Sequence, residues 1–202
     1  PGKKYTAKIS KSGKGRLYHK TRITYAPKGD DQNRQVAGFE IRRETLVKKQ
    51  NQWVQLSAND QLKPGDIIRR DIYLSIPAAR HYVVVDDPIP GGWEIVNTDL
   101  ANASQTDSKS NDLQYPADSF YLKYDDWQEY SSSYSGFYHK EMRFNGARFF
   151  ADYLNPGRYH LSYTAQAICA GNFSTLPVHV EEMYEPETFG KGLSSKVVIK
   201  NQ

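Results

Sequence analysis

Alternation of apolar and polar residues with a period of two is the feature that most restricts how this 202-residue chain can fold. Residues 159–167 are the clearest case, with apolar or aromatic side chains at Tyr159, Leu161, Tyr163, Ala165 and Ala167. Residues 68–76 repeat the pattern, whereas no segment keeps apolar residues at the three- and four-residue spacing of a helix. Because successive side chains of a strand point to opposite sides of a sheet, the chain is expected to be all-β.

Turn signals rich in Pro, Gly and Asn divide the chain into short predicted strands. These strands cover residues 17–25, 38–47, 53–56, 68–76, 82–85, 93–96, 140–144, 148–152, 159–167, 173–180 and 197–199. The continuous apolar run 82–85 indicates burial on both faces, and Pro177 indicates an edge position or a bulge. Asn145 and Gly146 indicate a tight hairpin turn. Together these signals predict an antiparallel β-sandwich of the immunoglobulin or fibronectin type.

The whole chain, residues 1–202, is interpreted as one β-sandwich domain with two stretches that need separate treatment. Residues 99–138 are first polar and then rich in Tyr, Phe and Trp, and we interpret them as a surface insertion. Residues 1–30 either begin this domain or supply the closing strand of a preceding one, and the sequence leaves both interpretations open.

Charge and cysteine content narrow the classes of function. The formal net charge is +4, and the sequence contains no long run of Lys and Arg. We therefore expect a solvated basic surface and no nucleic-acid partner. The single cysteine, Cys169, excludes an internal disulfide and is expected to be a small buried residue on a strand. No apolar stretch has the length of a membrane-spanning helix.

No catalytic or metal-binding constellation is evident. His139 and Glu141 are a histidine and a carboxylate close in sequence, but a surface pair is the favoured interpretation because a metal needs a full ligand set. Acidic doublets such as Asp86 and Asp87 point to opposite faces of a strand and make poor acid–base pairs. With no nucleophile elbow, phosphate loop or dinucleotide motif, we expect a non-enzymatic domain without metal or cofactor.

An ordered series of short blocks resembles the closing part of bacterial alpha-2-macroglobulin-like proteins. The blocks are residues 15–18, 62–66, 84–94, 154–167, 171–173, Pro177, 181–187 and 189–190. Pro-Gly turns are common, so the specific signal is the order of the blocks together with Glu-Glu-Met-Tyr near the end of the chain. The resemblance covers nearly the whole chain apart from about residues 99–135.

The resemblance implies a carboxy-terminal macroglobulin domain, similar to the receptor-binding domain of the animal proteins, in a broad-spectrum protease inhibitor. In that family, cleavage of a bait region exposes a thioester, which couples the attacking protease covalently. The resemblance implies that the last domain covers the thioester with a loop carrying a Met-Tyr pair, here Met183 and Tyr184. The expected partners are therefore other domains of the same polypeptide, above all the thioester domain, and target proteases through the full-length protein. A periplasmic or cell-envelope location with an upstream lipoprotein signal is also implied.

Two aromatic features have interpretations of their own. Tyr159 follows a turn and begins a long strand, which is typical of a tyrosine corner, whose hydroxyl ties a connection to the sheet. The rings of Trp127, Tyr130, Tyr134 and Tyr138 predict a contact surface that packs on protein or stacks on sugars. A carbohydrate- or peptidoglycan-binding module is therefore the alternative function.

Overall fold

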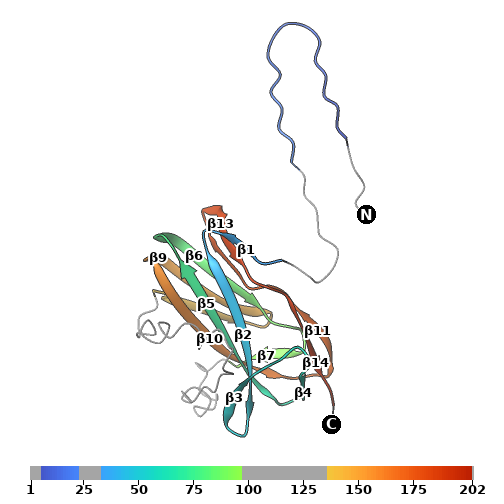
Figure 1. Ribbon diagram of the computed structural model, residues 1–202, viewed down its shortest axis with the longest axis vertical. Coiled ribbons are helices and arrows are strands. Elements are labelled where there is room, and N and C mark those ends of the chain that lie inside the picture. Colours follow the sequence, from blue (N-terminus) through green and yellow to red (C-terminus); the bar gives the residue numbers. More distant parts are fainter. Residues whose placement is uncertain (1–5, 23–32, 97–135, 202) are drawn as a thin grey trace.

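Strands and turns make up the folded part of the protein in a computed structural model, which describes residues 6–22, 33–96 and 136–201. Three sheets are formed (Figure 1). The six-stranded sheet has the order β1-β13-β12-β6-β9-β8, and the five-stranded sheet has the order β3-β2-β5-β10-β7. A three-stranded sheet, β11-β14-β4, completes the fold, so the predicted all-β sandwich is confirmed.

Each strand has defined bounds. The six-stranded sheet contains β1 (Gln35–Ala37), β6 (Arg80–Pro88), β8 (His139–Arg143), β9 (Gly146–Leu154), β12 (His179–Glu182) and β13 (Glu185–Lys191). The five-stranded sheet contains β2 (Glu40–Lys49), β3 (Gln52–Gln55), β5 (Ile67–Ile76), β7 (Trp93–Ile95) and β10 (Gly157–Ala167). The small sheet contains β4 (Gln61–Leu62), β11 (Gly171–Thr175) and β14 (Ser195–Ile199). Pairing is antiparallel in the two larger sheets, and β4 runs parallel to β14.

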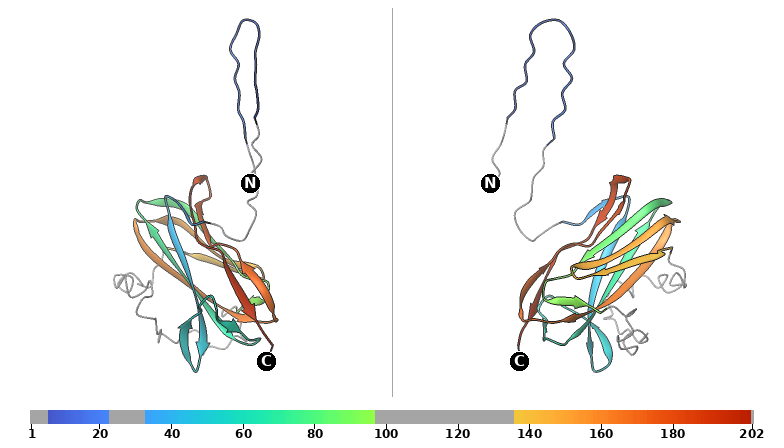
Figure 2. Two further views of the ribbon diagram at one scale, coloured as in Figure 1. Left: turned by 45° about the vertical axis from the view of Figure 1, so that its right-hand side comes forward. Right: turned by 180° about the vertical axis from the view of Figure 1, so that it is seen from behind.

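The six-stranded and three-stranded sheets are joined by one long hairpin with a break in it. Strand β11 continues into β12 through residues 176–178, and β13 continues into β14 through residues 192–194. The Gly192 amide donates to the Val178 carbonyl over 2.9 Å, so the two connecting segments stay in contact at the break. Pro177 lacks an amide hydrogen and explains why the sheet ladder stops there. Consequently both sheets lie in one layer that faces the five-stranded sheet (Figure 2).

Two apolar clusters fill the space between the layers. The larger one joins β2 and β5 to β6, β9 and β12, with Phe39, Ile72, Val85, Phe149 and Val180 among its members. The smaller one joins the far end of the five-stranded sheet to the small sheet, with Ile68, Trp93, Ala165, Val197 and Ile199 among its members. Alternation on β5 and β10 places these side chains inward, which is why the period-two pattern was informative.

Four sequence-based expectations are corrected by the structure. Residues 17–22 form no strand, and residues 23–25 lie outside the described part of the chain. Residues 82–85 belong to a half-buried strand, since Val83 and Val85 are buried while Tyr82 is exposed. The single strand expected over 173–180 is split into β11 and β12 at Pro177. Cys169 is exposed in a bend, because β10 has ended two residues earlier.

The hairpin expected near Asn145 and Gly146 exists, but its loop lies one residue earlier. Arg143 pairs with Gly146, so the two loop residues are Phe144 and Asn145. Gly146 is required for a different reason: a Cβ there would lie 2.7 Å from the Asp87 carbonyl oxygen of the neighbouring strand.

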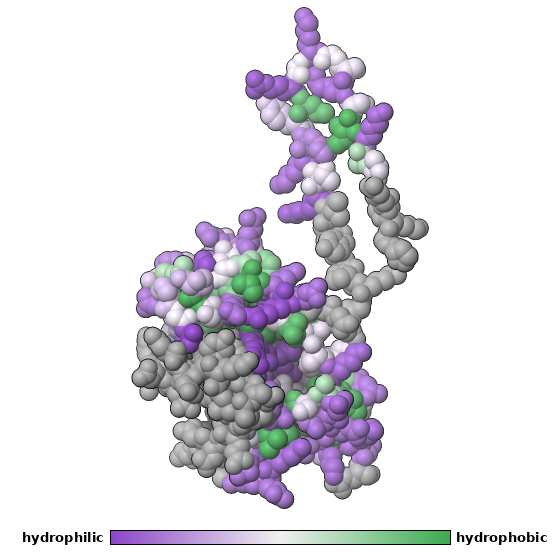
Figure 3. Space-filling view, in the orientation of Figure 1, coloured by the Kyte–Doolittle hydropathy of each residue, from purple (hydrophilic) through white to green (hydrophobic). Residues whose placement is uncertain are grey.

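Residues 6–22 form an extended arm that reaches away from the sandwich (Figures 1 and 2). Its surface is largely hydrophilic with isolated hydrophobic positions (Figure 3). The basic side chains of the arm are Lys8, Lys11, Lys14, Arg16, Lys20 and Arg22, and residues 6–22 contain no Asp or Glu. All of these side chains are exposed, so the positive charge of the arm lies in solvent.

Candidate docking site at one end of the sandwich

Met183 and Tyr184, which we call the tip, form the two-residue loop between β12 and β13. Glu182 pairs with Glu185 across the hairpin, so both tip residues lie beyond the last paired position. Met183 is 43% exposed and Tyr184 is 76% exposed. In Figure 1 the tip lies at the upper end of the sandwich, near the label of β13. A large thioether and a phenol ring are thus available to a neighbouring surface.

The start of β6 fixes the base of the tip. The buried carboxylate of Glu182 accepts a hydrogen bond from the His81 amide at 2.7 Å. Its second oxygen lies 3.6 Å from a guanidinium nitrogen of Arg80. The Met183 amide donates to the Tyr82 carbonyl at 2.9 Å. A shift in register between Glu181 and Glu182 turns the hairpin just before the tip, as β-bulges do.

An open recess of about 500 Å³ lies beside the tip, between the start of β6 and the start of β13. It is lined by residues 79–82, Glu182, Tyr184 and Glu185. The one buried carboxylate in it, Glu182, is engaged by backbone and by Arg80. This arrangement is suited to contact with another surface and provides no evident acid–base chemistry.

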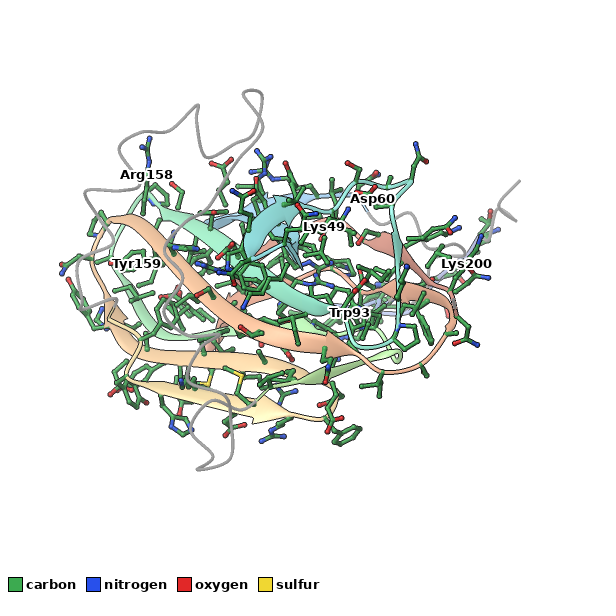
Figure 4. All side chains as sticks on the ribbon, turned by 90° about the horizontal axis from the view of Figure 1, so that it is seen from below. Lys49, Asp60, Trp93, Arg158, Tyr159 and Lys200 are labelled. Atoms are coloured by element: carbon green, nitrogen blue, oxygen red, sulfur yellow. The ribbon has the colours of Figure 1, made fainter. Side chains whose placement is uncertain are left out.

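Tyr159 lies near the amino end of β10, at the opposite end of that strand from Trp93 (Figure 4). Its hydroxyl donates to the Asn155 carbonyl, four residues upstream, over 2.7 Å. Burial raises the pKa of the hydroxyl, and the ring packs against the larger apolar cluster. A tyrosine corner has a hydrogen bond of this kind, from the hydroxyl to the connection before the strand, and that role for Tyr159 stays a prediction.

Tyr138 is the one described member of the predicted aromatic contact surface. It is 67% exposed, and its hydroxyl donates to a carboxylate oxygen of Asp152 over 3.0 Å. That hydrogen bond raises the pKa of the Tyr138 hydroxyl. Trp127, Tyr130 and Tyr134 lie outside the described residues, so the contact surface stays a prediction.

A charged cluster inside the sandwich was not anticipated from the sequence. The Arg43 guanidinium contacts the fully buried Asp87 carboxylate at 2.5 Å, and the Tyr163 hydroxyl donates to the other Asp87 oxygen at 2.6 Å. Arg70 is also fully buried, and its guanidinium carbon lies 4.6 Å from the centroid of the Trp93 ring. Burial, followed by the charge of Arg43, lowers the pKa of Arg70 to about 10. Burial, followed by the charge of Asp87, raises the pKa of Tyr163 well above its ordinary value.

One sequence signal pointed toward that cluster. Arg70 falls on the same face of its strand as Ile68 and Ile72, and an arginine in an apolar alternation implies buried charge. The other members of the cluster could not be identified in this way, because Asp87 is 44 residues from Arg43 and 76 residues from Tyr163.

Other chemistry was sought among the described residues. His139 and Glu141 approach to 3.6 Å on the exposed edge of β8, with Arg143 on the same carboxylate. Residues 6–22, 33–96 and 136–201 contain no group of three or more metal-ligating side chains that could hold an ion. The same ranges contain no helix that is long and apolar enough to cross a membrane.

The comparison with protein families decides what kind of domain this is. The model of the bacterial alpha-2-macroglobulin MG10 domain matches residues 38–187, which is most of the chain. The chain belongs to the bacterial alpha-2-macroglobulin family. An alpha-2-macroglobulin homolog of Nostoc is 26% identical over 208 residues, which cover the whole of this chain and 10% of the relative.

Solved structures agree on the fold. Alpha-2-macroglobulin of Escherichia coli activated by porcine elastase matches 83% of this chain and 13% of its own, with a TM-score of 0.64 and 18% identity. Salmonella alpha-2-macroglobulin reacted with methylamine matches 86% of this chain and 10% of its own, with a TM-score of 0.63 and 19% identity. This macroglobulin chain therefore spans about a tenth of the length of these relatives.

Proposed function

We propose that this chain is the carboxy-terminal, non-enzymatic domain of a broad-spectrum protease inhibitor, and that it packs on and shields the thioester region until the bait is cleaved. Membership of the bacterial alpha-2-macroglobulin family supports the role in a protease inhibitor. The exposure of the tip supports the role in shielding the thioester. The observation that carries the proposal is that Met183 and Tyr184 are exposed on a loop whose base is fixed to β6.

The chemistry of a thioester explains why such a tip is useful. A thioester is hydrolysed or aminolysed when water or amines reach it, so its lifetime depends on apolar cover. A methionine thioether adapts to irregular surfaces, and a tyrosine ring adds a large rigid contact. Contacts between domains are modest in area and can be released by a rearrangement, which a trigger requires.

We further propose that the full-length protein acts in the periplasm or cell envelope, anchored through an upstream lipoprotein signal. We also propose that residues 1–30 close the preceding domain rather than this one. Residues 6–22 support this second point, because they pair with none of the sandwich strands and extend away from them. The thioester domain of the same polypeptide and the trapped protease are the proposed partners.

The test is the reaction of the full-length protein with methylamine. Met183→Ala and Tyr184→Ala should each speed the loss of the thioester to methylamine, because each removes part of the cover. Phe144→Ala is the matched control, since Phe144 is 91% exposed but lies on the β8–β9 loop, away from the tip. Amine reactivity that is unchanged in both tip variants would refute the shielding role. A full-length protein that takes up no methylamine, even after proteolytic activation, would refute the thioester itself.

A further inference from the structure

Tyr82 stands beside the tip in a backbone conformation that its side chain disfavours. Its φ angle is +50°, in the left-handed region that residues other than glycine, asparagine and aspartate rarely adopt. For a bulky side chain this is an outlier, and such outliers persist only where the surrounding contacts impose them. The contacts of Tyr82 are therefore expected to impose its left-handed backbone conformation.

The backbone on both sides of Tyr82 is held by the hairpin that carries the tip. The preceding amide, of His81, donates to the buried Glu182 carboxylate at 2.7 Å. The Tyr82 carbonyl accepts the Met183 amide at 2.9 Å. These two hydrogen bonds clamp the start of β6 to the last residues of β12, with Tyr82 between them.

The side chain of Tyr82 then contacts the tip itself. Its ring meets the Tyr184 ring edge to face, with 5.1 Å between centroids and 88° between planes. Edge-to-face contact is a favoured arrangement of aromatic pairs. Tyr82 is 47% exposed, so its burial in the domain core is not what retains an aromatic residue at this strained position.

We propose that Tyr82 is a positioning residue, which holds the Tyr184 ring in its docking orientation before the tip meets the neighbouring domain. Tyr184 is mostly exposed, so a Tyr184 ring with no contact in its own domain would rotate freely until docking. Docking would then carry the entropy cost of fixing that ring. A ring fixed in advance avoids that loss, which is the general benefit of preorganisation in binding. The identity of the partner rests on the proposed function, whereas the positioning of the tip does not.

Three variants of Tyr82 in the full-length protein separate positioning from ordinary packing. Tyr82→Phe keeps the ring, because the contact with Tyr184 uses the ring edge and face. Tyr82→Gly removes the ring and also relieves the left-handed backbone, and Tyr82→Asn removes the ring with a side chain that tolerates that conformation. Tyr153→Ala is the matched control, since Tyr153 is also 47% exposed at this end but packs on His81.

Hydrogen exchange of the amides at residues 182–185 and the thermal unfolding midpoint are the two measurements. Tyr82→Gly and Tyr82→Asn should speed exchange at the tip by roughly 2- to 12-fold, the loss expected for one aromatic pair, while the midpoint stays the same or rises. Tyr82→Phe and Tyr153→Ala should leave exchange at the tip unchanged.

Two outcomes would overturn the positioning role. In the first, Tyr82→Gly lowers the midpoint with no change in exchange at the tip, which is the signature of ordinary packing. In the second, Tyr82→Phe loosens the tip as much as Tyr82→Gly does. Failure of the proposed function is distinguishable, because then Met183→Ala and Tyr184→Ala leave amine reactivity unchanged while Tyr82→Gly still loosens the tip.

Discussion

Asp87→Asn should destabilise the domain far more than the same substitution at its neighbour. Asp87 is completely buried, and it is the acidic partner of Arg43 at 2.5 Å and the acceptor of the Tyr163 hydroxyl. Asparagine keeps the shape but removes the charge, which leaves the Arg43 guanidinium buried without its anion and takes a nearby negative charge away from the buried Arg70. Breaking a buried pair in this way costs about 3–5 kcal/mol.

Urea unfolding followed by circular dichroism measures that cost. With a denaturant slope of about 2 kcal/mol/M, the midpoint of Asp87→Asn should fall by roughly 1.5–2.5 M. Asp86→Asn is the matched control, because Asp86 contacts Arg148 at 3.1 Å with both side chains about one-third exposed. An ion pair of that kind contributes less than about 1 kcal/mol. Midpoint shifts of equal size in the two variants would refute the assignment of Asp87 as the electrostatic centre of the core.

Three further outcomes are expected. Arg70→Met should leave the free energy of unfolding unchanged or raise it, because the buried Arg70 guanidinium makes no hydrogen bond to the described residues and the pair of Arg43 and Asp87 is neutral without it. A loss of more than about 1 kcal/mol in the same urea assay would contradict this. Tyr159→Phe should lower the free energy of unfolding by about 0.5–1.5 kcal/mol through loss of the hydrogen bond to Asn155, and Tyr153→Phe should not. The protein should not be retained on peptidoglycan in a pull-down, and retention that disappears when Trp127, Tyr130, Tyr134 and Tyr138 are changed to Ala would support the alternative function instead.

The period-two alternation predicts a strand correctly where one face of the strand packs on the opposing sheet. It predicts wrongly where no sheet packs on the segment. Strand β10 follows the expected alternation from Leu161 onward, because its inward positions meet the opposing sheet. In β5 the expected inward positions are also buried, but Asp71 and Tyr73 on the other face are buried as well. The same pattern over residues 17–22 meets no sheet within the part of the chain that the structure describes, and no strand forms there. Cys169 continues the spacing of Ala165 and Ala167, but the strand has already ended and the thiol is exposed.

Long-range pairings explain most of what the sequence could not reveal at the candidate site. Met183 and Tyr184 were identified through a family resemblance, and their place in the sequence says nothing about the support beneath them. That support comes from Arg80, His81 and Tyr82, about a hundred residues away, and it involves a backbone amide and a carbonyl that no side-chain pattern encodes. The left-handed conformation of Tyr82 is equally silent in the sequence, since a glycine or asparagine would have been the usual signal.

The interrupted hairpin connects the tip to the opposite end of the domain through two continuous stretches of backbone. Strands β12 and β13 carry the tip, and the same two stretches of chain continue as β11 and β14 beneath the second apolar cluster. At the junction, the Arg43 side chain donates to the Leu176 carbonyl at 2.9 Å and to the Thr175 hydroxyl at 3.0 Å. A force applied to the tip by a moving neighbouring domain would therefore be transmitted along both backbone segments to the hydrogen bonds of Arg43 at the junction. The force would be shared by the strands of the whole layer and would not act on the loop alone.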